Sequence, residues 1–131
     1  MSDRAEPPTE LVGRLRALCL ALGGAVEIEA WTGTSWRVGD VTFAHIVQID
    51  GGWPPRYVRA FQTDGPATVV TFQSDEAEAL TANGHPFYRP GWRRDTVGLV
   101  VDDDTDWEEL NELLVDSHLI CSVRPRRRAT R

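Results

Sequence analysis

One dipeptide, Gly39 followed by Asp40, does most to limit how this chain can fold. It separates two β-rich stretches, residues 34–38 and 41–47, and glycine in the first central position suits a two-residue type II′ turn. Strands joined by such a turn pair antiparallel, because the chain reverses direction between them. The sequence therefore predicts a hairpin and, around it, an antiparallel sheet.

A helix and a strand are predicted before the hairpin. Leucines recur at helical spacing over residues 11–22, and Gly23 and Gly24 end this helix, since glycine readily adopts the left-handed conformation that terminates helices. Residues 26–30 then alternate apolar with acidic side chains, which is typical of a strand with one face in solvent. The acidic face, with Glu27 and Glu29, is expected to be the solvent face.

The chain beyond the hairpin mixes loops with regular elements. Glycine and proline punctuate residues 50–66, which predicts a loop that holds at most a short strand around 56–62. Residues 85–95 are irregular and basic. The other elements follow from periodicity and capping residues: a strand at 68–73, a helix at 75–82 capped by Ser74, a strand at 96–101 and a last helix at 106–121.

This order of elements predicts an α+β fold. A mostly antiparallel sheet would carry helices from the N-terminus, the middle and the C-terminal part of the chain. A length of 131 residues suits a single core rather than two. We expect a flexible N-terminus at residues 1–8, one α+β domain at 9–123 and a disordered arginine-rich tail at 124–131.

Charge is distributed unevenly along the chain. The formal net charge is −6, and removing the five arginines of the last eight residues leaves −11 for residues 1–123. A strongly acidic body disfavours general binding of polyanions, because phosphate contacts come from basic side chains. Any binding of nucleic acid would therefore have to be local.

Two cysteines and the apolar segments bear on the compartment. Cys19 and Cys121 lie in apolar helical stretches and are interpreted as buried thiols, although a bond between them stays open. No apolar run approaches the roughly 20 residues that cross a bilayer, and the first ten residues contain no signal-peptide core. We expect a cytoplasmic protein with no membrane partner.

Three patches of sequence resemble the MmcQ/YjbR-like family of small bacterial domains. They comprise residues 18–22 leading to 27–31, residues 36–39 with Phe43 and Ala44, and Gly91 and Trp92 with residues 106–114 and Ser117. The resemblance implies the "double-wing" fold described for that family, and DNA binding, which is proposed for the family from the shape of this fold. It implies no cofactor and no reaction.

The chain departs from the family pattern at several positions. Gly23 stands where the family usually has proline, and Trp36 where it usually has phenylalanine. Gln73 replaces a frequent lysine, and His118 replaces a frequent aromatic residue. The missing lysine removes a positive charge that binding to nucleic acid would use.

Arginines interleaved with aromatic residues form the candidate nucleic-acid site. Guanidinium groups contact phosphates and rings stack on bases or sugars. The alternative is a solvated loop in which Trp92 anchors the core. The candidates in residues 85–95 are Arg89, Arg93 and Arg94 beside Tyr88 and Trp92; Arg56 and Arg59 lie in the middle of the chain, and Arg124, Arg126, Arg127 and Arg128 lie in the tail.

Five tryptophans raise a second hypothesis, a module that binds a protein or a small ligand. Trp53 lies in a loop of glycines and prolines, where it is either an exposed binding contact or a clamp of the loop onto its own domain. In this hypothesis the acidic body faces a basic partner, and Trp53 or Trp31 lines a cleft. Arg37 and His85 are further candidates for this site. Four of the tryptophans are expected in the core because large rings bury much apolar area: Trp31, Trp36, Trp92 and Trp107.

Catalytic and metal-binding patterns do not occur in the sequence. His45, His85 and His118 form none of the spacings that hold zinc, and no nucleophile elbow or phosphate-binding glycine loop is present. The acidic run 102–106 lacks the glycine and the glutamate of a calcium-binding loop and is interpreted as a helix cap. We therefore expect no enzyme, cofactor or metal, and an enzyme that uses His45 or His85 with a carboxylate is the third hypothesis.

Overall fold

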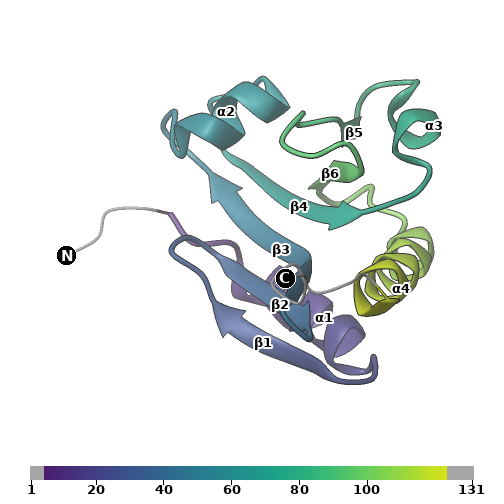
Figure 1. The fold of residues 1–131 in the computed structure, drawn as a ribbon. Coiled ribbons are helices and arrows are strands. Elements are labelled where there is room, and N and C mark those ends of the chain that lie inside the picture. The colour runs from purple at the N-terminus through teal and green to yellow at the C-terminus, as the bar shows by residue number, and fades with distance from the viewer. Residues whose placement is uncertain (1–4, 124–131) are drawn as a thin grey trace, which may run out of the picture.

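The computed structural model describes residues 5–123, which form a six-stranded antiparallel sheet and four helices (Figure 1). The predicted α+β fold with a mainly antiparallel sheet is confirmed. The elements in chain order are α1 (Thr9–Leu20), β1 (Ala25–Glu29), β2 (Thr34–Val38), β3 (Val41–Ile49), α2 (Pro55–Phe61), β4 (Ala67–Gln73), α3 (Ala77–Thr81), β5 (Phe87–Tyr88), β6 (Thr96–Val101) and α4 (Trp107–Val123).

The sheet has the strand order β1-β2-β3-β4-β6-β5, and the predicted hairpin joins β2 to β3. Val38 pairs with Val41, so the turn contains only Gly39 and Asp40. Gly39 has a φ of +61° and Asp40 has no positive φ, which fits a type II′ turn. The glycine is needed here because a side chain at this φ would be strained.

A bulge in β3 lies opposite Trp36. Trp36 pairs with Ala44 whereas Arg37 pairs with Thr42, which leaves Phe43 as an extra residue. Phe43 and Ala44 consequently both belong to the same buried cluster instead of facing opposite sides of the sheet. The bulge thus adds one large ring to the main core.

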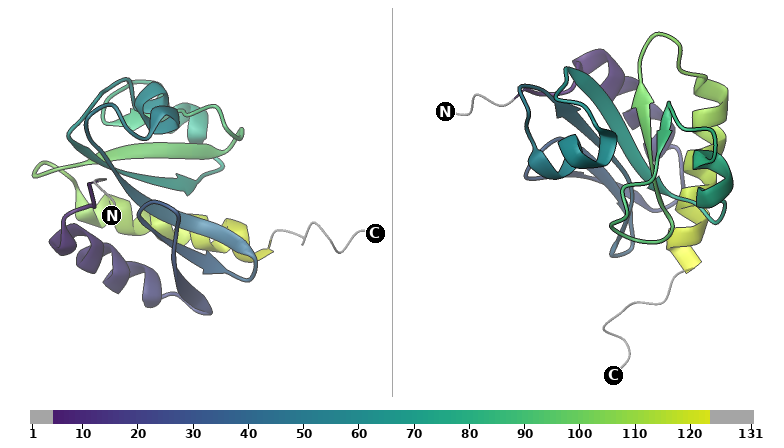
Figure 2. Two further views of the ribbon diagram at one scale, coloured as in Figure 1. Left: turned by 90° about the vertical axis from the view of Figure 1, so that its left-hand side faces the viewer. Right: turned by 90° about the horizontal axis from the view of Figure 1, so that it is seen from above.

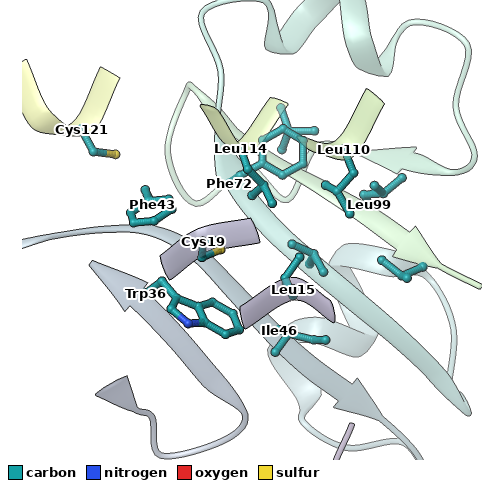
Figure 3. Close-up of a cluster of buried hydrophobic side chains, with 14 of the residues drawn as sticks. Leu15, Cys19, Trp36, Phe43, Ile46, Phe72, Leu99, Leu110, Leu114 and Cys121 are labelled. Carbon is teal, nitrogen blue, oxygen red and sulfur yellow. The ribbon is translucent and has the colours of Figure 1, made fainter. Parts of the chain in front are cut away.

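The main core lies between the sheet and the pair α1 and α4, which run beside each other in Figure 2. Cys19 and Cys121 are free thiols buried in it, as the sequence predicts. α3 closes one end of this core through Ala77. Its largest members are close to fully buried and several of them are drawn in Figure 3: Leu15, Trp36, Phe43, Ile46, Phe72, Leu110 and Leu114.

A second, smaller core lies under α2 on the opposite face of the sheet. The packing of this core requires glycine at position 98 of β6, because a Cβ there would overlap the ring of Phe61. α2 can therefore approach the sheet closely only where β6 has no side chain. The buried members of this core are Val47, Ile49, Tyr57, Phe61 and Val69.

The prediction of a loop with at most a short strand around 56–62 is wrong, because α2 occupies Pro55–Phe61. The helix starts at Pro55, whose fixed φ suits a first helical position, and it ends at Gln62 in the left-handed conformation. β5 is also absent from the prediction. It has only two residues, which pair with Gly98 and Leu99 of β6.

The predicted solvent face of β1 is confirmed for Glu29, which is exposed, and wrong for Glu27, which is turned inward. Val26 is 53% exposed, whereas Glu27 pairs with Trp36 and faces the side of the sheet that α1 covers. The Glu27 carboxylate accepts hydrogen bonds from Nε and Nη2 of Arg16 at 2.8 and 3.0 Å, and from Nε1 of the fully buried Trp36 at 3.0 Å. The Glu27 carboxylate gives the N–H of the buried Trp36 indole an acceptor, which this N–H could not find in water, and pairs with the exposed Arg16.

Two of the four tryptophans expected in the core are only half-buried, and one lies outside it. Trp36 is fully buried, and Trp92 and Trp107 are half-buried, Trp107 under the guanidinium of Arg14 at 4.2 Å. Trp31 is 69% exposed, so its predicted place in the core is wrong. It follows β1 in a tight loop whose Gly33 leaves no room for a side chain against the Ile46 carbonyl, and this loop holds Trp31 away from the core.

Ser117 connects α4 to the sheet from inside the main core. Its hydroxyl donates to the Phe43 carbonyl at 2.7 Å and accepts from the Gln73 N–H at 2.9 Å. Ser117 is completely buried and has both hydrogen-bonding roles satisfied. The bulge in β3 and the end of β4 are thereby fixed to the same turn of α4.

The predicted division at 8 and 9 and at 123 and 124 stays a prediction; in the described residues, α1 starts at Thr9 and α4 is described to Val123. Residues 1–4 and the tail 124–131 lie outside the described residues, so the predictions of flexibility and disorder there stay predictions. Within residues 5–123, no helix has the length and apolar character to cross a membrane.

Candidate nucleic-acid interface

The loop between β5 and β6 is closed on itself by polar contacts. Arg89 Nη2 donates to the Arg94 carbonyl at 2.9 Å, and the Thr96 N–H donates to the Arg93 carbonyl at 3.3 Å. A further bond from the Ser74 N–H to the Asp95 carbonyl, at 2.8 Å, fixes the end of the loop to the end of β4. The loop that contains Arg89, Arg93 and Arg94 therefore has a defined position beside α2 and α3.

One pocket of about 340 Å³ lies between this loop and α2. Arg56 and Arg59 are one helical turn apart and line it together with Ala60, Pro90 and Trp92. The Arg56 guanidinium carbon lies 4.2 Å from the ring centroid of Trp92, within the range of a cation–π interaction. No carboxylate lines this pocket in the part of the chain that the structure describes, so its lining has a formal charge of +2.

A larger pocket of about 580 Å³ lies on the other side of the loop, against α3. Its lining has a formal charge of zero, and Arg93 Nε lies 3.8 Å from the Asp95 carboxylate. An anion in this pocket would therefore meet negative as well as positive groups. The charged residues of the lining are Arg89, Arg93 and Arg94 with Asp75, Glu78 and Asp95.

The same loop lines both pockets, and we call the arginines of the two linings, together with Trp92, the arginine surface. Pro90 and Trp92 face the pocket at α2, and the arginines on either side of them face the pocket at α3. All five arginines are exposed. The arginine surface consists of Arg56, Arg59, Arg89, Arg93, Arg94 and Trp92.

The structure brings the predicted loop arginines to one pocket and adds Arg56 and Arg59 beside them. The four tail candidates, Arg124, Arg126, Arg127 and Arg128, lie outside the described residues. Trp92 fits both interpretations that the sequence allows. It packs against the second core as an anchor, and it also lines a surface pocket.

The remaining predicted site residues lie elsewhere. Arg37 is exposed on β2 and pairs with Val26 of β1, at the opposite side of the sheet from β5. His85 Nδ1 lies 3.0 Å from the Tyr88 hydroxyl, and the residue lines a third pocket of about 320 Å³. Four carboxylates line that pocket, so it does not extend the arginine surface: Asp102, Asp104, Asp106 and Glu109.

Trp31 and Trp53 form an aromatic pair at the ends of β1 and β3. Their ring centroids are 5.5 Å apart and the rings are nearly perpendicular, at 82°. Trp53 is half-buried, and Asp50 pairs with it across the loop through backbone hydrogen bonds. The two tryptophans that the sequence nominates for one partner site are thus in contact.

His45 connects the loop after β1 with α2. Its Nε2 lies 2.8 Å from the Thr32 carbonyl, which can only accept, and its Nδ1 lies 3.4 Å from the Tyr57 hydroxyl. Burial lowers the pKa of His45, partly opposed by the bond to Thr32, and burial raises the pKa of Tyr57 to about 12. Both side chains are therefore neutral at neutral pH and act as a structural brace.

In residues 5–123, no group of three or more His, Cys, Asp or Glu side chains is arranged to hold a metal ion. His45 and His85 also lie in different surroundings, one beside Tyr57 and the other beside Tyr88. The helix cap that the sequence predicts in the acidic run 102–106 is confirmed for Asp106, whose carboxylate accepts from the Glu109 N–H at 3.1 Å.

Sequence reasoning noted Arg56 and Arg59 but missed their arrangement. Interpreted as part of a loop, the two residues have no defined relation, whereas helical spacing of three puts them on one face. The signal was present in Pro54 and Pro55, because proline is frequent at the first position of a helix.

Comparison with known proteins gives the family. No curated protein matches the chain. The profile of the YjbR family matches residues 20–120, which include every strand and α2 and α3 as well as most of α4. The match covers most of the 131 residues and agrees with the resemblance seen in the three sequence patches. The chain therefore belongs to the YjbR family.

Proposed function

We propose that this YjbR-family domain is a binding module without a reaction of its own, and that it contacts the phosphates of nucleic acid, DNA in particular, through the arginine surface. The observation that carries the proposal is the pocket at α2, where Arg56 and Arg59 stand beside Trp92 with no carboxylate in the described lining. Guanidinium groups bind phosphate oxygens with two N–H donors at once, which suits an exposed cationic pocket of this kind.

The two pockets are expected to contribute unequally. Carboxylates in the pocket at α3 oppose an incoming phosphate, whereas the pocket at α2 has two arginines and no such opposition among its described residues. Arg56 and Arg59 should therefore dominate binding, with smaller contributions from Arg89, Arg93 and Arg94.

Binding of this kind would be independent of base sequence. Trp92 already has the Arg56 guanidinium on its face and Tyr57 against it at 5.0 Å and 70°, so a base has little free ring to stack on. Contacts to phosphate fix position and carry no sequence information directly. The −11 charge of residues 1–123 further restricts contact to this local surface.

The test is a titration of a labelled duplex, followed by fluorescence anisotropy, at about 50 and about 200 mM salt. Replacing Arg56 and Arg59 together by glutamine should weaken binding at least about tenfold and reduce the salt dependence by about two phosphate contacts. Arg37→Gln is the control for a lost surface charge, because Arg37 is also an exposed arginine and lies on the far side of the sheet.

Two further variants separate the contributions of the loop arginines and of the tail arginines to duplex binding. Arg89→Gln with Arg93→Gln should weaken binding less than the pair at α2, and replacing the four tail arginines measures what the residues after Val123 add. Absence of binding at the lower salt concentration would refute the proposal. Equal losses for Arg37→Gln and for the pair at α2 would also refute it.

A further inference from the structure

The outer edge of β1 is a free sheet edge. β1 is the first strand in the sheet order and pairs with β2 alone among the described residues, and Figure 1 shows it as the outermost strand on its side. The opposite edge, β5, has two residues, whereas β1 has five. A strand of this length presents a row of backbone groups to which another strand can pair.

The direction of these backbone groups follows from the hairpin register. The Ala30 N–H points inward, because it donates to the Gly33 carbonyl across the loop. Backbone groups alternate along an antiparallel strand, so those of Ile28 and Val26 also point toward β2. The N–H and C=O groups of Glu27 and Glu29 therefore point outward, away from the sheet.

Exposed apolar side chains lie along the same edge. Val26 is 53% exposed, Ile28 is half-buried, and Trp31, just beyond the strand, is 69% exposed. Proline, lysine and bulges, which often protect a free edge from pairing, are absent from β1, so the charges of Glu27 and Glu29 are its protection against an unsuitable strand. An added strand would bury these side chains as well as the free backbone groups.

Charge decides which kind of strand fits. A second copy pairing antiparallel through its own β1 would bring Glu27 of one copy opposite Glu29 of the other, or Glu27 opposite Glu27, and like charges directly opposite are destabilising. Arg16 already neutralises Glu27, but Glu29 is exposed and has no such partner in the described residues. A strand with basic residues opposite Glu29 avoids this repulsion.

We propose that the free edge of β1 binds an extended basic peptide segment, which adds to the sheet as a seventh strand. Its basic side chains lie on the side of Glu27 and Glu29, and its intervening apolar side chains lie on the side of Val26 and Ile28. Trp31 stands at the end of the site, where it can stack on an arginine of the peptide. This site lies across the sheet from β5 and does not depend on the arginine surface.

The probe is a capped peptide of alternating arginine and valine, with the same peptide carrying glutamate in place of arginine as control. Binding to the full chain is measured by calorimetry, and amide hydrogen exchange reports where the peptide lies. We expect the arginine peptide to bind at least about tenfold more tightly than the glutamate peptide, as opposed charges on neighbouring strands favour pairing. It should also slow the exchange of the Glu27 and Glu29 amides.

The variant that tests the backbone contact is Glu29→Pro. Proline removes the outward N–H but leaves the bonds between β1 and β2, so the fold should persist while peptide binding falls at least about tenfold. Glu29→Gln keeps the N–H and removes only the charge, and should lose less. Duplex binding should be unchanged in both variants, which separates a failure of this site from a failure of the arginine surface.

Three results would overturn the inference. The first is equal binding of the arginine and glutamate peptides, or no binding of either. The second is unchanged peptide affinity in a folded Glu29→Pro chain. The third is protection of the Glu27 and Glu29 amides that rises with protein concentration in the absence of peptide, which would identify a second copy as the occupant.

Discussion

The two faces of the sheet differ in the size of the core that they carry and in the side chains that they expose. The face under α1 and α4 holds the larger core, and its polar residues Glu27 and Ser117 have their hydrogen bonds made inside the protein. The face under α2 holds a core of five buried residues, and its helix turns Arg56 and Arg59 outward. One face supplies stability, and the other supports an exposed cationic surface.

This division implies that stability and binding can be altered separately. A core substitution beneath α4 should lower the free energy of unfolding, and the molecules that stay folded should bind a duplex with unchanged affinity. A core substitution beneath α2 should lower both the free energy of unfolding and the affinity for a duplex, because this small core positions Arg56 and Arg59 of the arginine surface.

Leu114→Ala should have the largest effect on stability. Leu114 is fully buried in the main core, and truncating a buried leucine costs about 2–5 kcal/mol of unfolding free energy. Urea unfolding measures the loss, and duplex affinity at temperatures where the variant is folded should equal that of the parent chain. A selective loss of affinity would show that the two faces are coupled.

Gly98→Ala should have an intermediate effect and should reach the binding surface. The new methyl group must displace the Phe61 ring, and such overpacking costs about 1–3 kcal/mol. Because Phe61 ends α2, duplex binding should weaken as well.

Gly13→Ala is the matched control for this change. A Cβ there meets no atom within 4 Å and lies within α1, so alanine should stabilise the protein by about 0.5–1 kcal/mol and leave binding unchanged. Destabilisation of similar size in both variants would contradict the assigned role of Gly98.

Glu27→Gln should have the smallest effect, and that effect should depend on pH. Hydrogen bonds from Arg16, supported by the one from Trp36, lower the pKa of Glu27 in the folded protein. The carboxylate therefore adds stability above its ordinary pKa of about 4.3, and this contribution disappears as pH falls through the lower folded value. The difference in unfolding free energy between parent and variant should be constant near neutral pH and shrink in acid; a constant difference down to about pH 2 would exclude this charge effect.

Elements with strong local signals could be predicted from the sequence. The leucine repeat gives α1, the turn of Gly39 and Asp40 gives the hairpin, and alternating or β-branched residues give β4 and β6. Each of these depends on residues that are neighbours along the chain. The gathering of the arginines of the loop after β5 at one pocket follows in the same way from their short separation.

Features that depend on distant residues could not be predicted. β1 alternates correctly, but which face is buried depends on Arg16 and the indole of Trp36, which are not part of the strand. Pro54 and Pro55 mark the start of α2, but the helix is too short for its periodicity to show, and its place on the sheet depends on the absence of a side chain at Gly98. Trp31 looks like a core residue by type and is exposed because of the loop that carries it.

Ser117 has a consequence for the order in which the domain can form during synthesis. Its hydroxyl joins Phe43 and Gln73, which are 74 and 44 residues earlier in the chain, and the buried residues of α4 complete the same core. α1 and the sheet strands emerge from the ribosome first, and the part of this face that α4 covers stays open until α4 is made. At roughly 5–20 residues per second the strands wait several seconds in this state, so the nascent domain should need protection from aggregation on the face that α4 later covers.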